Sequence, residues 1–558
     1  MKDLLIIALL LTFFGANSQE KYWVYFTDKN NVSFEAENYF HPNAIARRNR
    51  ISYPLNHSTD LPVNMLYKSE VSNRVDEYLG ASRWLNAAVV MANEEQIEAI
   101  EKLPFVKHVE PSGFVKMICS TEESVESDSD FERQDLMRFQ IERMQADKFA
   151  ANGYRGKGIR IAIFDAGFPG VDEAEMFEHI RSRDGIKGTY DFIRKTENVY
   201  RKISHGSTVL SCIAGIAGDS IMLGVAPDAD FLLAITEKLM KEGLAEEEAW
   251  LFAAEWADKN GVDIINSSLG YTRRSHFKTD MDGNTTVITK AANLASSKGI
   301  LVVSSAGNEG NKNNWMMMAA PADGDSVLAV GAINPWSGFH TSFSSFGPSA
   351  DKELKPNVTG VGHVVAYGVN DKLHMTQGTS FSAPLIAGFA ACAWQANPGL
   401  SNWELLKRIE QSGDLYPYFD YAHGYGVPQA TAFLQDQPKQ ALHPDSLFNI
   451  HIEQETITVG IRDEYLNQDS LDVQTNIPDR VANKIMERIN ENVNLPIDEE
   501  HPFEKRELFY YHIENNANYL DEFSVVSVDE NPILQLDIEN LNGTLRFHYR
   551  GVTKEIHF

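Results

Sequence analysis

The sequence predicts an α/β fold with a mostly parallel sheet flanked by helices, preceded by a small α+β unit and followed by a β-sandwich-like module. The short apolar run at residues 161–164 is typical of a strand buried in a parallel sheet. Small and apolar runs beginning at Val209 and Phe381 indicate buried helices. A chain of 558 residues is too long for one hydrophobic core, so we expect several units.

The first 18 residues have the pattern of a secretory signal peptide. Lys2 lies before an apolar run at residues 4–14, and small residues lead to a cleavage position near Ser18. The apolar run is too short to span a membrane. We therefore predict a signal peptide over residues 1–18 and a secreted, extracellular protein without a transmembrane segment. A periplasmic or cell-surface location is the alternative to release from the cell. For the segment itself, the alternative to a signal peptide is a buried N-terminal strand or helix.

Residues 19–118 are predicted to form the small α+β unit. A strand is expected at residues 21–27, and a strand, a helix and a strand at residues 84–91, 94–104 and 106–111. Residues 119–134 are polar and acidic and cannot bury a core, so we interpret them as a flexible linker.

Four motifs between residues 161 and 384 carry groups that can act together in catalysis. Ser380 supplies a hydroxyl that becomes nucleophilic when a base takes its proton, and His205 is the candidate base. Asp165 would orient the imidazole and stabilise its charged form. The side-chain amide of Asn308 and the backbone N–H of Ser380 are candidate donors to a developing oxyanion.

The local sequence places these groups where such chemistry is found. Asp165 ends a predicted buried strand, and Gly167 would let the chain turn after it. Ser380 lies at the start of an apolar segment in which Pro384 is expected to occupy the first helical turn. Each motif alone has an ordinary structural explanation as a cap, loop or turn. Four of them in this order favour catalysis.

The motif at residues 378–384 resembles the nucleophile signature of the subtilase family, and residues 305–310 resemble its oxyanion segment. The order Asp, His, Ser differs from the orders in chymotrypsin-like enzymes and α/β-hydrolases. The resemblance covers about residues 135–437 and implies a subtilisin-like fold and a serine endopeptidase acting through an acyl-enzyme intermediate. It assigns the catalytic roles to Asp165, His205, Ser380 and Asn308 and makes proteins or peptides the substrates.

The resemblance also implies a substrate-binding cleft between two segments. An extended peptide would pair with the chain as an added strand, with the first specificity pocket between the segments. The expected residues are Ser268, Leu269, Gly270, Ser305, Ala306 and Gly307. The alternative for Ser268 and Leu269 is ordinary strand packing.

Two departures from the family pattern lie beside the candidate groups. Ala166 follows the aspartate where a hydroxyl residue is usual, and Ser207 replaces the usual Thr two positions after His205. A loop that binds calcium in many relatives has Gly218 in place of an asparagine, and Asp219 alone is far short of the 6–8 oxygens that calcium takes. We expect no required cofactor or metal; structural calcium is possible, but no clear site supports it.

Residues 19–118 resemble the inhibitor-type propeptides of secreted subtilases. This implies that the chain's own propeptide is an intramolecular inhibitor, with processing in or near the acidic linker. A linker that is never cut is the alternative.

Composition limits the possible partners. The 78 acidic and 50 basic residues give a net charge of −28, which opposes binding to nucleic acid. Three cysteines without motif spacing argue against a disulfide framework. Cys212 and Cys392 are expected to be buried thiols, with a bond between them left open. We expect a monomer.

Residues 438–558 alternate between apolar and polar positions in several segments, which predicts the β-sandwich-like module. Two rival functions remain for the whole chain. One is a catalytically weak or inactive scaffold used for binding, and the other is an esterase using the same triad. An acid-acting sedolisin-like enzyme is disfavoured because those enzymes have a glutamate where His205 stands.

Overall fold

The computed structural model describes most of the chain. The described residues are 19–112, 130–201, 203–218, 221–237, 245–272, 276–368, 372–434, 444–453, 455–466, 507–516, 519–528, 533–538 and 541–558. The predicted signal peptide, Cys119, Asp219 and most of the predicted linker lie outside these residues.

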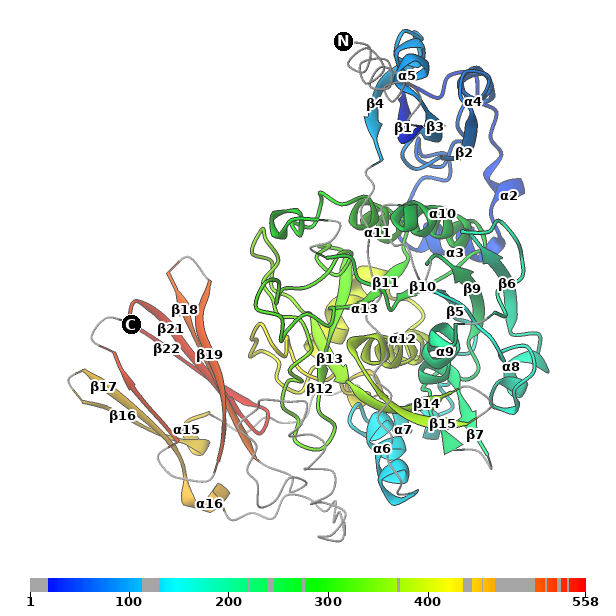
Figure 1. Ribbon diagram of the computed structural model, residues 1–558. Coiled ribbons are helices and arrows are strands. Elements are labelled where there is room, and N and C mark those ends of the chain that lie inside the picture. The colour runs from blue at the N-terminus through cyan, green and yellow to red at the C-terminus, as the bar shows by residue number, and fades with distance from the viewer. Residues whose placement is uncertain are drawn as a thin grey trace, which may run out of the picture.

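A seven-stranded parallel sheet forms the centre of the molecule (Figure 1). Its order is β13-β12-β11-β10-β5-β9-β6, and every neighbouring pair is parallel. The strands are β5 (Arg160–Asp165), β6 (Ile186–Asp191), β9 (Asp230–Ile235), β10 (Ile264–Ser267), β11 (Leu301–Ser305), β12 (Val327–Ile333) and β13 (Val358–Val361). The predicted α/β fold class is confirmed.

Helices cover both faces of this sheet. Ile161 and Ile163 of β5 join a core with α9 (His205–Ala214) and α12 (Thr379–Ala396). The alternate residues Ala162 and Phe164 join a second core with the helices of the other face, α10 (Ala245–Lys259) and α11 (Val287–Ser297). Because both faces of the strand are buried, its sequence is apolar throughout and does not alternate.

Shorter elements complete this central part. They are α6 (Asp130–Glu142), α7 (Ala146–Ala151), η1 (Glu175–Phe177), α8 (Glu178–Arg181), β7 (Ile216–Ala217), β8 (Ile221–Met222), η2 (Lys278–Asp280), β14 (His363–Tyr367), β15 (Leu373–Gln377), α13 (Asn402–Gln411) and α14 (Thr431–Leu434).

The N-terminal region forms a four-stranded antiparallel sheet of order β2-β3-β1-β4 beside α10 and α11 (Figure 1). Its elements are β1 (Glu20–Phe26), α2 (Ala36–Tyr39), α3 (Pro42–Arg50), α4 (Met65–Ser72), β2 (Glu77–Ser82), β3 (Ala87–Ala92), α5 (Glu94–Glu101) and β4 (Val106–Pro111). Trp23 and Trp84 are buried in one core with α10 and α11. The predicted strand, helix and strand are present, whereas α2, α3, α4 and β2 were not foreseen.

The C-terminal region holds two antiparallel sheets around one core. One sheet has the order β16-β17-β20 and the other β19-β18-β21-β22. The elements are α15 (Pro444–Leu447), β16 (Phe448–Glu453), β17 (Thr456–Ile461), α16 (Asp463–Leu466), β18 (Leu508–Asn515), β19 (Leu520–Ser527), β20 (Leu534–Asp537), β21 (Gly543–Tyr549) and β22 (Val552–His557). This agrees with the predicted β-sandwich-like module.

Cys212 and Cys392 are buried free thiols, as expected. Burial raises the pKa of the Cys212 thiol to about 12. In the part of the chain that is described, none of the helices has the length and apolar character needed to cross a membrane.

Candidate active site

Asp165 and His205 form a hydrogen-bonded pair at the carboxyl edge of the central sheet. Asp165 is the last residue of β5, and His205 is the first residue of α9. His205 Nδ1 lies 2.8 Å from Asp165 Oδ1 and 2.9 Å from Oδ2. A carboxylate only accepts hydrogen bonds, so Nδ1 donates and Nε2 is the basic nitrogen of the neutral ring. The carboxylate is fully buried, whereas the imidazole is 18% exposed.

Two glycines allow the segments that carry this pair to approach each other. A Cβ on Gly167 would lie 2.8 Å from the Ile203 carbonyl oxygen, and one on Gly206 would lie 2.5 Å from the Gly167 carbonyl oxygen. Gly167 was expected to let the chain turn after Asp165; the chain bends at Ala166, directly before it, and the φ of Gly167 is not positive. Its role is close backbone approach, which the sequence did not reveal because the contact is made by a distant segment.

Ser380 is the second residue of α12, and the carbonyl of its peptide is held from outside the helix. Pro384, four residues later, has no N–H to donate to this carbonyl. The Ser268 hydroxyl donates to it instead, at 2.8 Å, while the Ser380 hydroxyl donates to the Ser268 carbonyl at 3.2 Å. Pro384 therefore lies beyond the first helical turn, contrary to the expectation, and this position leaves a carbonyl that Ser268 uses.

The residue after Ser380 lies beside the imidazole. The Phe381 ring centroid is 5.6 Å from that of His205, and Phe381 is buried in the same core as α9. The start of α12 is thus packed close to the Asp165–His205 pair. Both candidate groups, His205 and Ser380, lie at helix N-termini, where the helix dipole favours negative charge.

The side chain of Asn308 is oriented by the residue before the serine. The Thr379 backbone N–H and hydroxyl donate to Asn308 Oδ1 at 3.0 and 2.8 Å. With its oxygen held in this way, the amide presents Nδ2 as the donor. Gly307 precedes Asn308 with φ +106°, a conformation that favours glycine.

The two expected cleft segments follow adjacent strands. β10 and β11 are parallel neighbours with Ser267 paired to Ser304, so residues 268–270 and 305–307 leave the sheet side by side. The side chains of Leu269, Ser305 and Ala306 are buried, and Leu269 belongs to the core. What these segments can present to an extended peptide is therefore mainly backbone and glycine surface.

Sequence reasoning missed three features of this site. Thr379 as the residue that orients Asn308 was not named, and neither was the hydroxyl role of Ser268. Ala319 was missed as well; its Cβ would be 2.8 Å from a Cβ on Gly270 and 3.3 Å from one on Gly307. The four-residue spacing between Ser380 and Pro384 was a sequence signal that the Ser380 carbonyl lacks a helical N–H partner. No neighbouring residue in the sequence marked Ala319.

The departures from the family pattern have structural roles. The Ala166 backbone N–H donates to Asp165 Oδ1 at 2.7 Å, so the carboxylate is bonded without a hydroxyl at that position. The Ser207 hydroxyl donates to the Pro169 carbonyl at 2.7 Å. Among the described residues, no three His, Cys, Asp or Glu side chains are grouped so as to hold a metal ion.

Comparisons with known proteins agree with this geometry. Residues 156–426 match the model of the subtilase family, and residues 21–128 match the peptidase S8 propeptide domain of Bacteroidota. Subtilisin DY of Bacillus licheniformis is 31% identical over 293 residues, which cover 52% of this chain and 97% of that protein. The chain belongs to the subtilase family. It is a serine-type endopeptidase with a subtilase propeptide domain.

Other subtilases are similar over different lengths. Subtilisin NAT of Bacillus subtilis subsp. natto is 28% identical over 368 residues, which cover 65% of this chain and 85% of that protein. Alkaline elastase YaB of Bacillus sp. strain YaB is 28% identical over 288 residues, which cover 52% of this chain and 68% of that protein.

Proposed function

We propose that Asp165, His205 and Ser380 are the catalytic triad of this subtilase. The observation that carries the proposal is the hydrogen bond from His205 Nδ1 to Asp165, with the start of α12 packed against the same imidazole. His205 Nε2 takes the proton of the Ser380 hydroxyl as its oxygen attacks the peptide carbonyl, and later gives it to the leaving amine. Asp165 keeps the ring in the required tautomer and stabilises the imidazolium.

Asn308 and the Ser380 backbone N–H supply the oxyanion donors in this proposal. Thr379 holds Asn308 Oδ1, so the Nδ2 hydrogens are directed by a fixed amide plane rather than by a rotating side chain. Donors fixed before the reaction need no reorganisation when negative charge develops on the substrate oxygen.

The substrate is proposed to be an extended peptide lying beside residues 268–270. Gly270 and Gly307 keep the two segments free of side chains at the point where both approach Ala319, and this favours a pocket there bounded by backbone. Main-chain pairing of this kind selects extended peptides over small esters.

We further propose that the protein is secreted and that the propeptide, residues 19–118, is its intramolecular inhibitor, removed by cleavage in or near residues 119–134. The proposed peptidase domain is residues 135–437, and residues 438–558 form a C-terminal module. The match to a propeptide domain supports the inhibitory role.

Labelling with a fluorophosphonate followed by peptide mapping tests the triad. We expect the label on Ser380, and no label after Ser380→Ala or His205→Ala. Ser382→Ala is a matched control, because it removes a hydroxyl from the same helix and should leave labelling intact. A label that persists in Ser380→Ala, or hydrolysis of short esters without hydrolysis of denatured casein, would overturn the proposal.

A further inference from the structure

The propeptide helix α3 lies outside the four-stranded sheet and packs on the ends of two helices of the peptidase domain. The His41 backbone N–H donates to the Lys259 carbonyl at the end of α10 at 2.8 Å. Gly261 and Gly299, which follow α10 and α11, have positive φ, and a Cβ at either would touch α3 residues. Both helix ends are therefore shaped to receive α3.

Arg47 of α3 binds both of these helix ends. Its Nε donates to the Lys298 carbonyl at 3.0 Å, its Nη1 donates to the Val262 carbonyl, and its Nη2 lies 2.5 Å from Asp258 Oδ1. Lys298 is the C-cap residue of α11. A guanidinium here meets the C-cap carbonyl of α11, a carbonyl three residues beyond α10, and the negative dipole ends of both helices.

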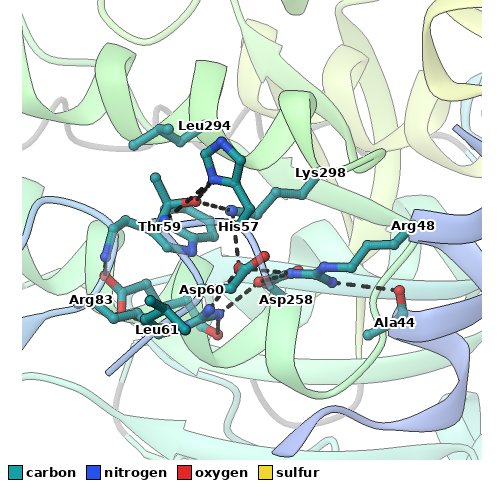
Figure 2. A network of polar contacts seen from close by, with 12 residues as sticks. Ala44, Arg48, His57, Thr59, Asp60, Leu61, Arg83, Asp258, Leu294 and Lys298 are labelled. Atoms are coloured by element: carbon teal, nitrogen blue, oxygen red, sulfur yellow. Dashed lines mark hydrogen bonds and ion pairs between the residues drawn. The ribbon is translucent and has the colours of Figure 1, made fainter. Parts of the chain in front are cut away.

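A buried network of charges continues from Arg47 (Figure 2). Asp258 of α10 accepts from Arg48 at 2.8 Å and from Arg83 at 2.7 Å as well as from Arg47. Asp60 of the propeptide accepts from Lys298 of the peptidase domain at 3.0 Å. The side chains of Arg48, Asp60, Asp258 and Lys298 are fully buried. Arginines of the propeptide thus meet a carboxylate of the enzyme, and one propeptide carboxylate meets an enzyme lysine.

This contact lies at the opposite edge of the sheet from the candidate active site. Val262 and Lys298 come just before β10 and β11, whereas Ser268 and Ser305 stand at the carboxyl ends of the same strands. The propeptide also reaches the other end of α10, where the Ser112 hydroxyl donates to Glu248 at 2.6 Å. It therefore holds α10 at two separate places.

We propose that residues 36–64, together with Arg83, form a rear clamp that keeps the cleaved propeptide on the enzyme through the ends of α10 and α11, away from the candidate active site. This rests on the proposed function, because it concerns how the inhibitory propeptide is retained. A charge buried in such a network cannot lose one partner without leaving another uncompensated. Cutting the chain between the domains does not touch these contacts, so inhibition outlasts cleavage until the clamp is broken.

The test uses the full chain with Ser380→Ala, which cannot process itself, and with residues 120–126 replaced by the recognition sequence of a site-specific protease. After cutting, the dissociation rate of the propeptide fragment is measured on the purified complex. We expect the parent complex to stay together on size-exclusion chromatography. Arg47→Met should speed dissociation by about 100-fold or more, because it leaves Asp258 and two helix ends short of a donor.

Two further variants make the result specific. Arg47→Lys keeps the positive charge but loses the several N–H donors of the guanidinium, so we expect a dissociation rate between those of the parent and Arg47→Met. If the Arg47→Met chain does not fold, Arg47→Lys is used in its place. Arg74→Gln is the control, because Arg74 pairs with Glu70 on the exposed face of α4. Parent-like dissociation of the Arg47 variants, or equally fast dissociation of Arg74→Gln, would overturn the clamp. Neither outcome bears on Ser380 labelling, so the two proposals can fail separately.

Discussion

Among the described residues, two Asp–His pairs have nearly equal geometry, and their surroundings separate them. In the first, His205 Nδ1 lies 2.8 and 2.9 Å from the oxygens of Asp165. In the second, His423 Nδ1 lies 3.0 and 3.1 Å from those of Asp420. Both carboxylates are fully buried.

The two rings differ in their exposure and in the groups that lie beside them. His423 Nε2 accepts the backbone N–H of His340 at 3.1 Å, and its side chain is 4% exposed. His205 is 18% exposed and faces the start of α12. A base needs a nucleophile within reach of its ring, so an Asp–His pair by itself does not identify an active site.

The second pair instead joins the peptidase domain to the C-terminal module. The Tyr418 hydroxyl lies 3.1 Å from Asp420 Oδ2 and 3.1 Å from the Tyr511 carbonyl of β18. Burial opposes ionisation of Asp420, but the contact with His423 lowers the pKa of this carboxyl below its ordinary value. The pair is a structural one, and we expect it to act on stability.

The largest expected effect distinguishes the two Asp–His pairs by the kcat of variants that lack the histidine. His205→Ala should lower kcat by about 10⁶-fold, the size found when a subtilisin loses its catalytic histidine, with little change in Tm. His423→Ala should keep kcat per folded molecule within about threefold, since its ring has no part in the reaction. Both are measured with one peptide substrate at a temperature where each variant is folded. Comparable losses of kcat in the two variants would remove the distinction.

The next largest expected effect distinguishes the two Asp–His pairs by their contribution to the free energy of unfolding. His423→Ala leaves the Asp420 carboxylate buried without its partner and the His340 N–H without its acceptor. We expect a loss of about 2–4 kcal/mol in the free energy of unfolding, measured by denaturant titration. His451→Ala is the control because His451 is exposed on β16. A stability loss for His423→Ala no larger than that of the control would contradict the structural role.

Acidification should affect the surroundings of the second pair through histidines that are buried in the neutral form. Burial lowers the pKa of His340 to about 3 and the pKa of His548 to about 4. An unfolded histidine takes up a proton near pH 6.5, so between about pH 6.5 and pH 4 the unfolded state binds more protons. Stability is therefore full above pH 6.5 and falls by about 1.4 kcal/mol per pH unit for each such histidine.

Thermal unfolding at a series of pH values measures this loss. His548→Gln should flatten the pH dependence of Tm, because the variant lacks one histidine that is buried in the neutral form. A Tm that stays constant from pH 7 to pH 4.5 would refute the assignment of buried neutral histidines.

The smallest expected effect is on kcat and concerns Ser268, which bonds the start of α12 beside the Asp165–His205 pair. Ser268→Ala removes the hydroxyl that bonds the Ser380 carbonyl, and the loss of one such bond should lower kcat by about tenfold with little change in KM. Ser268→Thr, which keeps a hydroxyl, should retain most of the activity. A change in KM alone would assign Ser268 to substrate binding instead.

Much of the candidate active site could be proposed from the sequence because each group has a local signal. An apolar strand ending in Asp165 and a helix start at Ser380 are written in adjacent residues. The close backbone contact at Gly167 was not foreseen because it is made by Arg201 and Ile203, far along the chain. Arg47 and Arg48 were overlooked as functional residues, although two adjacent arginines near others in an acidic chain are a visible signal.

The sequence by itself determined the candidate reactive groups, their order and the strand or helix end on which each stands, since these depend on neighbours a few residues away. The tertiary structure alone decided that Thr379 orients Asn308, that His423 pairs with Asp420, and which arginines of the propeptide reach Asp258. Except for the His423–Asp420 pair, these contacts join segments far apart in the chain. They arise from the register of the sheet and the packing of helix ends, which no short stretch of sequence encodes.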